Sequence, residues 1–210
     1  MIRVERPSEP ETFDETCRQP GNRWLREHPE TDPHSKPLWA SFRGRLKEAF
    51  HRRCGLLAHR VGDETVDHWL SIKNNRELAY EWSNYRWISG TLNSAKKPCW
   101  DGKLLDPFEV EDDWFEILLP SLQMVLVASL PEPVRKRAEF TMNKLHLRDG
   151  TRVLDQRGEW LALYEKNGIT FEVLQYFAPL IAKAVAKRDG LEIESKDSAA
   201  IEPSSDPCCS

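Results

Sequence analysis

The hydrophobic spacing changes along the chain, and this change restricts the fold more than any other feature of the sequence. Residues 38–53 carry apolar side chains at a helical spacing, whereas short apolar runs bounded by turn residues occupy the middle of the chain. From residue 131 onward the helical spacing returns, with Val134, Ala138, Met142 and Leu145 on one stripe. Helices on both sides of a strand-containing middle predict an α+β fold.

The positions of single elements follow from the same spacing and from turn signals. We expect a β-hairpin over residues 54–68, with its turn at VGDET and its second strand ending at Val66-Asp67-His68. One or two helical turns are expected in residues 75–82. Further predictions are strands at 114–119 and 122–127 and helices over 83–97, 131–147, 151–166 and 171–188.

Composition and charge exclude several classes of protein. The 210-residue chain is 40% hydrophobic and 30% charged, which is typical of a globular protein and not of a disordered one. Its net charge of −4 argues against a uniformly basic nucleic-acid-binding protein. A local basic groove remains open, built from Arg43, Arg45, Arg52, Arg53 and Lys96. No apolar run approaches the roughly 20 residues that span a bilayer, and the N-terminus lacks the apolar core of a signal peptide. We therefore expect a cytoplasmic protein without a membrane partner.

Changes in composition divide the chain into four parts. Residues 1–37 are rich in proline and polar groups and predict an extended N-terminal arm. Residues 38–128 form the predicted core, and residues 129–190 form a C-terminal helical region. Residues 191–210 have the composition of a disordered tail.

The segment TVDHWLSIKNNRELAYEWSNYRWISGTLNSAKK, residues 65–97, carries the chemistry of interest. The carboxylate of Asp67 is a hard oxygen ligand for a divalent ion, and the neighbouring His68 has an ordinary pKa near neutrality that suits a general base. Asn84, Asn93 and Lys96 follow, and they could pin a loop, complete a metal shell and bind a phosphate. An Asp-His dipeptide alone is more often a surface or capping pair than a catalytic one.

The order of these residues resembles the HNH endonuclease family and its ββα-metal motif. The matching residues are Val66-Asp67-His68, then Trp82-Ser83-Asn84, then Asn93 with Lys96. With ELAYEWSNYRW and LLDPFEVEDDWFEI on either side, the chain looks like a bacterial branch found in anti-phage defence, similar to the nuclease component of Septu-like systems. The likeness in motifs covers about residues 50–117.

The resemblance implies a role for each matching residue. Asp67 and Asn93 would hold Mg²⁺ or Mn²⁺, His68 would activate water, and Asn84 would orient the loop that carries His68. The implied activity is metal-dependent hydrolysis of phosphodiester bonds in DNA. Residues that could contact the nucleic-acid backbone are Lys96, Lys97, Arg52 and Arg53.

One departure from the family concerns zinc. Members of this branch carry two Cys-x-x-Cys pairs, and here only Cys54 stands at such a position, while Leu57, Ser89 and Leu92 replace the others. Structural zinc is therefore not expected, and the scattered cysteines predict reduced thiols. His59 lies near Cys54, but two ligands are too few for a tetrahedral site, so a histidine of the predicted hairpin is the favoured interpretation.

A rival function keeps the same fold without the activity. The motif could be catalytically silent and serve as a binding module, with the C-terminal helices and the acidic segment 106–116 docking a partner, such as the ATPase of a defence complex. Metal binding at Asp67 separates the two hypotheses.

Overall fold

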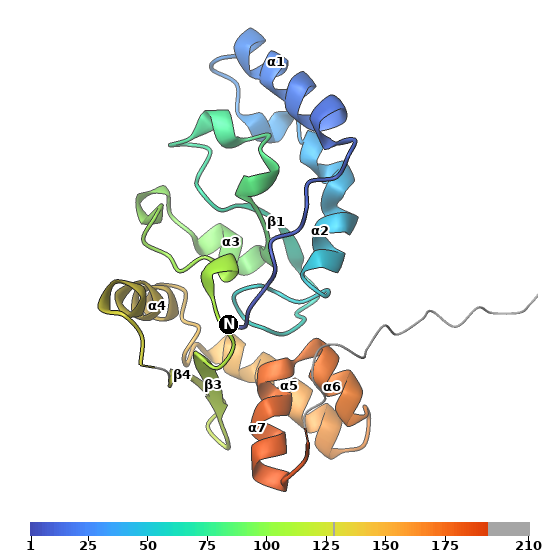
Figure 1. Ribbon diagram of the computed structural model, residues 1–210, viewed down its shortest axis with the longest axis vertical. Coiled ribbons are helices and arrows are strands. Elements are labelled where there is room, and N and C mark those ends of the chain that lie inside the picture. Colours follow the sequence, from blue (N-terminus) through green and yellow to red (C-terminus); the bar gives the residue numbers. More distant parts are fainter. Residues whose placement is uncertain (128, 193–210) are drawn as a thin grey trace, which may run out of the picture.

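The predicted α+β class is confirmed in a computed structural model, which describes residues 1–127 and 129–192. Figure 1 shows α1 and α2 at one end of the molecule, α5, α6 and α7 at the other, and short strands between them. The helices and strands are α1 (Gln19–Glu27), α2 (Arg43–Ala49), β1 (Glu64–His68), β2 (Tyr85–Ser89), α3 (Gly90–Ala95), β3 (Phe115–Leu118), β4 (Gln123–Leu126), α4 (Glu132–Lys144), α5 (Thr151–Glu165), α6 (Phe171–Phe177) and α7 (Pro179–Asp189).

The N-terminal segment is extended only in its first ten residues. These run from the middle of the molecule towards α1 (Figure 1), and Trp82 donates a hydrogen bond to the Pro7 carbonyl at 3.1 Å. The prediction of an extended arm over residues 1–37 is wrong for 14–27, which are helical. α1 buries only Gly21, so it has no apolar stripe to reveal it in the sequence. A Cβ at Gly21 would lie 2.2 Å from a ring carbon of Tyr80, so the glycine lets that ring pack against the helix.

The predicted hairpin over residues 54–68 is wrong. Only residues 64–68 form a strand, and the partner of β1 is β2, which begins 17 residues later and runs antiparallel to it. The predicted helix over 83–97 is also wrong in its first half, because residues 85–89 are β2 and the α-helix covers only Gly90–Ala95. All five residues of β2 are buried, and its aromatic and β-branched side chains favour a strand. The result is a consecutive strand, strand and helix, hereafter the β1–β2–α3 unit.

The β1–β2–α3 unit lies between two hydrophobic cores. The N-terminal core packs apolar side chains from residues 4–50, including α2, against Val66, Tyr85 and Trp87. The C-terminal core packs the later helices against Trp69 and Ile88. Successive residues of a strand point to opposite faces, so β2 supplies Trp87 to one core and Ile88 to the other.

The C-terminal half largely follows the predicted pattern. The two predicted strands are β3 and β4, and helices α4 and α5 fall where the apolar stripes place them. The predicted helix over 171–188 is broken into α6 and α7 at Ala178-Pro179, because the residue before a proline is disfavoured in helical geometry. The predicted tail, apart from residues 191 and 192, lies outside the described residues.

Several acids of the segment 106–116 form ion pairs with basic residues of the chain. Glu109 pairs with Arg137 at 2.6 Å, Glu116 pairs with Lys187 at 3.3 Å, and Asp113 pairs with Lys183. The pairs of Asp113 and Glu116 connect β3 and the residues just before it to α7. Docking of a partner by this segment stays a prediction, and several of its charges already pair within the chain.

Candidate active site at the end of strand β1

Asp67 is buried in the β1–β2–α3 unit and forms an ion pair with Lys96. The Asp67 side chain is 2% exposed, and Lys96 Nζ lies 2.5 Å from its Oδ2. The same ammonium donates to the carbonyls of His68 and Trp69, each at 3.2 Å, and lies 4.6 Å from the centre of the Trp69 ring. Burial raises the pKa of Asp67, while Lys96 acts in the opposite direction. Lys96, which follows the last turn of α3, thus links that helix to the end of β1.

His68 ends β1 and lies in a cluster of aromatic rings. Its ring centre is 4.6 Å from that of Trp39, 5.2 Å from Tyr85 and 5.8 Å from His34. His68 Nε2 lies 2.9 Å from the carbonyl of Ala79. A carbonyl only accepts, so Nε2 carries the hydrogen and Nδ1 of the neutral ring holds the lone pair. Burial lowers the pKa of His68 to about 4, so the ring is neutral at pH 7.

Asp67 and His68 are neighbours in sequence but belong to different faces of the sheet. Asp67 is paired across the strands with Arg86, and His68 is paired with Tyr85. The alternation of side chains along a strand directs the Asp67 carboxylate towards Lys96 and the His68 imidazole into the aromatic cluster. Only at the end of β1, where Lys96 reaches the His68 carbonyl, do the surroundings of the two residues meet.

Asn84 closes the loop between β1 and β2. Its Oδ1 accepts a hydrogen bond from the Leu70 amide at 2.8 Å, and its Nδ2 donates to the carbonyls of Leu70 and Leu78 at 3.0 and 3.3 Å. The buried amide side chain therefore joins the start of the loop to its far end. Leu78 precedes Ala79, whose carbonyl accepts the hydrogen bond from His68 Nε2. Asn84 thus holds the backbone next to the carbonyl that contacts His68.

Asn93, the second predicted metal ligand, lies in α3 and is partly buried. Its main-chain carbonyl accepts a hydrogen bond from the Lys96 amide at 3.2 Å. α3 packs against β1, so Asp67 and Asn93 offer a carboxylate and an amide oxygen from neighbouring elements, and Mg²⁺ and Mn²⁺ accept such oxygen donors. Because Lys96 holds Oδ2 of Asp67, this donor set fits a divalent ion only once the lysine has moved away. Within the described residues, no group of three or more His, Cys, Asp or Glu side chains could hold a metal.

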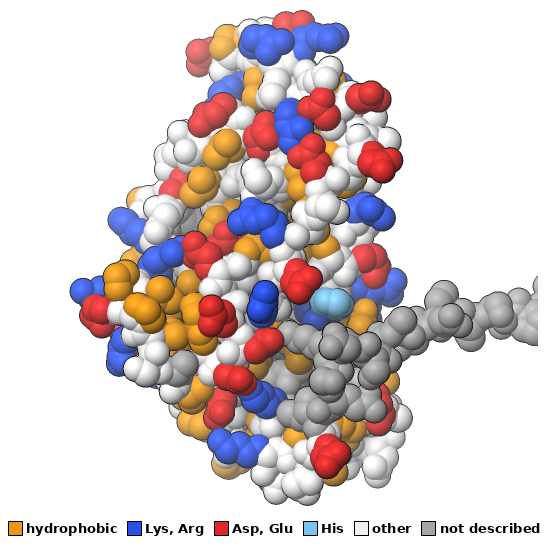
Figure 2. All heavy atoms as spheres, in the orientation of Figure 1, with side chains coloured by type: hydrophobic (Ala, Val, Ile, Leu, Met, Phe, Trp, Pro, Cys, Tyr) orange, Lys and Arg blue, Asp and Glu red, His pale blue; other side chains and the backbone are white. Residues whose placement is uncertain are grey.

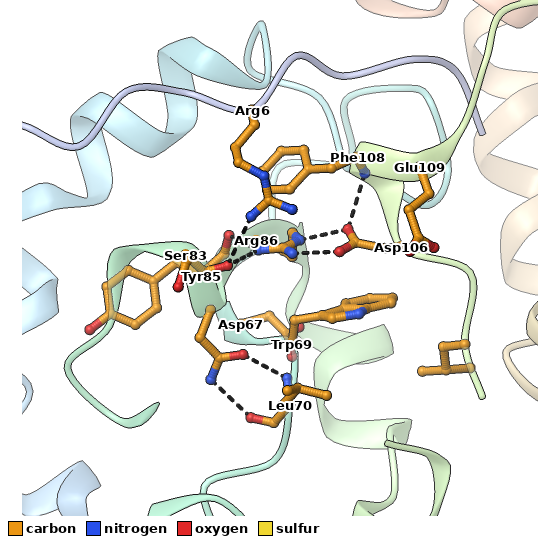
Figure 3. A network of polar contacts seen from close by, with 12 residues as sticks. Arg6, Asp67, Trp69, Leu70, Ser83, Tyr85, Arg86, Asp106, Phe108 and Glu109 are labelled. Atoms are coloured by element: carbon orange, nitrogen blue, oxygen red, sulfur yellow. Dashed lines mark hydrogen bonds and ion pairs between the residues drawn. The ribbon is translucent and has the colours of Figure 1, made fainter. Parts of the chain in front are cut away.

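A second buried ion pair, which the sequence did not indicate, adjoins Asp67. Arg86 binds Asp106 through two hydrogen bonds of 2.7 and 2.5 Å, and both side chains are nearly inaccessible to solvent. Figure 3 shows the Arg86 guanidinium between the rings of Phe108, 4.0 Å from its centre, and Trp69, 5.8 Å away. Asp106 stands in a run of acids, so only its tertiary environment distinguishes it from its exposed neighbours.

The predicted nucleic-acid contacts differ in how freely they reach solvent. Lys96 is turned inward, with its side chain 10% exposed, and Arg52 pairs with Glu48 on α2 at 3.0 Å. Arg53 is partly buried, and this burial lowers its pKa to about 10. Lys97 is exposed, with its ammonium 5.7 Å from the centre of the Trp100 ring. On the face drawn in Figure 2, acidic and basic side chains are interspersed.

The positions that correspond to the family's Cys-x-x-Cys pairs lie in a packed part of the protein. Cys54 is fully buried, burial raises its pKa to about 11, and its Sγ accepts a hydrogen bond from the Ser89 amide at 3.2 Å. Leu57 and Leu92 are buried in the same core as Cys54. His59 is also buried, with Nδ1 3.1 Å from the Leu57 carbonyl, in a turn that contains no strand.

Comparison with known proteins adds no family assignment. The chain matches no model of a known protein family, and a search of curated proteins gives no match. Among the described residues, no helix is both long enough and apolar enough to cross a membrane.

Proposed function

We propose that the chain is a metal-dependent endonuclease of the HNH type that hydrolyses phosphodiester bonds in DNA, acting in the cytoplasm as part of anti-phage defence. The observation that carries the proposal is the position of His68. The Ala79 carbonyl accepts a hydrogen bond from His68 Nε2, and Asn84 holds the loop that supplies this carbonyl. An imidazole held in this tautomer presents Nδ1 as a proton acceptor, as a general base requires.

The order of elements supports the same proposal. β1, β2 and α3 follow one another, with Asp67 and His68 at the end of the first strand, Asn84 just before the second, and Asn93 and Lys96 at the helix. This is the order in which a ββα-metal motif presents its residues. A DNA phosphate lying across the end of β1 would reach His68 on one side and the Asp67–Lys96 pair on the other.

Each residue then has a defined task. His68 takes a proton from water through Nδ1, and the resulting hydroxide attacks the phosphorus. Asn84 acts as a positioning residue, through the backbone that it holds. Asp67 and Asn93 would hold Mg²⁺ or Mn²⁺, which when bound would supply positive charge near the phosphate. Lys96 would turn from Asp67 to the phosphate when the ion takes its place.

Cleavage of supercoiled plasmid by the purified chain tests this proposal. The assay is run with Mg²⁺, with Mn²⁺ and with EDTA, and we expect nicking only with a metal. His68→Ala is expected to lower the rate by roughly 10²- to 10⁴-fold, the usual contribution of a general base. The matched control is His28→Ala, since His28 is exposed and lies outside the β1–β2–α3 unit.

A measurement of tertiary packing separates an effect on catalysis from an effect on folding. Near-ultraviolet circular dichroism must show that His68→Ala keeps its tertiary packing, because the ring contacts Trp39 and Tyr85. Equal nicking by wild type and His68→Ala, in preparations freed of contaminating nucleases, would refute the proposal.

The Asp67–Lys96 pair favours a second candidate function. An ammonium that is hydrogen-bonded to a carboxylate and two carbonyls has all its donors used, which suits a structural role. The unit would then be a catalytically silent binding module that docks a partner ATPase. Binding of Mn²⁺, measured by the broadening of its electron paramagnetic resonance signal, decides between the two. An enzyme binds Mn²⁺, loses it in Asp67→Ala and binds it more tightly in Lys96→Met, whereas the silent module responds to neither change.

A further inference from the structure

A second histidine stands beside the proposed base. His34 belongs to the short helical turn Pro33–Ser35, and its ring centre lies 5.8 Å from that of His68. Both rings also contact Trp39, at 5.7 and 4.6 Å. Whereas His68 is largely enclosed, the His34 side chain is 62% exposed. His34 therefore lies where solvent or a substrate approaches His68.

Asp32 orients His34. Its Oδ1 accepts hydrogen bonds from the His34 amide and from His34 Nδ1, both at 2.9 Å. The hydrogen bond from the His34 backbone amide is the main cause that lowers the pKa of Asp32. The hydrogen bond from the imidazole comes next, and the charge of Lys73 also contributes. With Nδ1 donating to the carboxylate, Nε2 of His34 is the nitrogen left to exchange a proton with a ligand.

The loop between β1 and β2 holds this turn in place. Arg76 donates from its two terminal nitrogens to the carbonyls of His28 and Thr31, both at 2.6 Å. Tyr80 donates its hydroxyl hydrogen to the Lys36 carbonyl at 2.9 Å. The loop that Asn84 closes and that orients His68 therefore also anchors the segment on both sides of His34. The position of His34 relative to His68 is built into the fold.

From this arrangement we infer that His34 is the general acid of the proposed reaction, with Asp32 as its positioning residue. The inference rests on the proposed hydrolysis and adds a catalytic residue to it. Two imidazoles on one side of the sheet, one held as a base and the other oriented by a carboxylate, match the two proton transfers of phosphodiester hydrolysis. Lys73, whose charge acts on Asp32, adds positive charge for a phosphate at this position.

The protons and bonds balance. Water gives a proton to Nδ1 of His68 as its oxygen bonds to phosphorus. The bond between phosphorus and the leaving sugar oxygen breaks, and that oxygen takes the proton from Nε2 of protonated His34. The products are a phosphate monoester and a free hydroxyl, and exchange with solvent returns His34 and His68 to their starting states.

Two substrates with different leaving groups test this assignment. A sugar alkoxide needs a proton to leave, whereas the nitrophenolate of bis(4-nitrophenyl) phosphate leaves readily without one. We expect His34→Asn to lower plasmid cleavage by roughly 10²- to 10⁴-fold and to change hydrolysis of the nitrophenyl ester only a few fold. Asp32→Asn should give a smaller loss with the same dependence on the leaving group. Lys73→Met serves as a charge control and should weaken both reactions alike through KM.

The outcomes separate this inference from the proposed function. If wild type hydrolyses neither substrate with either metal, the proposed function fails and the role of His34 fails with it. If wild type is active and His34→Asn loses both reactions equally, His34 supports binding or structure and is not the acid. Unchanged plasmid cleavage by His34→Asn also overturns the assignment.

Discussion

Replacing Lys96 with methionine removes the charge that neutralises Asp67 while keeping an unbranched side chain against Trp69. In the wild type the two charged atoms lie 2.5 Å apart, and their side chains are 10% and 2% exposed. Removing one partner of such a pair leaves a buried charge unpaired, which typically costs about 3–5 kcal/mol. The carboxyl group can avoid this cost by taking up a proton.

The free energy needed to protonate Asp67 limits how much stability the variant loses. Protonating a carboxyl of ordinary pKa 3.8 at pH 7 costs about 4.4 kcal/mol, at about 1.36 kcal/mol per pH unit. At pH 5 the same protonation costs about 1.6 kcal/mol. We therefore expect Lys96→Met to lose about 3–4 kcal/mol at pH 7 and markedly less at pH 5. For a chain of this length the loss at pH 7 lowers the melting temperature by roughly 6–16 °C.

The sign of the pH dependence follows from linkage. Burial already raises the pKa of Asp67 in the folded protein, and the loss of Lys96 raises it further. The folded state then holds a proton that the unfolded state has released, so stability falls as the pH rises above 3.8 towards the folded pKa. The deficit of the variant should consequently be largest at neutral pH.

Urea unfolding at pH 7 and pH 5, followed by tryptophan fluorescence, measures the loss of stability and its dependence on pH. The matched control is Lys136→Met on α4, where the pair with Glu132 is 3.4 Å long and its side chains are 72% and 65% exposed. Exposed pairs of this kind contribute less than about 1 kcal/mol. If the two variants lose the same small amount, or if the deficit of Lys96→Met is independent of pH, the reasoning about a buried ion pair is refuted.

Three further substitutions test other parts of the structure. Asn84→Ala removes the buried amide that joins the ends of the loop, so we expect a loss of about 1–3 kcal/mol in urea unfolding and a fall in plasmid cleavage beyond what instability explains. Asp106→Asn leaves Arg86 buried without its carboxylate and should cost about 3–5 kcal/mol in the same assay. Gly21→Ala brings a Cβ against the Tyr80 ring, so thermal unfolding should show a loss of about 1–3 kcal/mol; an unchanged melting temperature would contradict the close packing of α1 on that ring.

The helices with apolar stripes were predictable because their pattern repeats within a few residues. The stripe through Ala138 and Met142 predicts α4, and the turn at Pro120-Ser121 predicts the break between β3 and β4. β1 and β2 failed as a prediction for the opposite reason. Their pairing joins residues on either side of a 16-residue loop, and β2 is buried on both faces, so it lacks the polar and apolar alternation of a half-exposed strand.

For the candidate site, the chemical groups and their order can be read from the sequence alone. Asp67, His68, Asn84 and Asn93 could be named from the motif, because side-chain chemistry and spacing are local properties. The contacts of each group, in contrast, depend on the tertiary fold. It directs Asp67 to Lys96 and brings His34 to His68 from a segment 34 residues away in sequence. The physical reason is that strand alternation, burial and long-range pairing set the partners of a buried polar group, and none of these is visible in a short stretch of sequence.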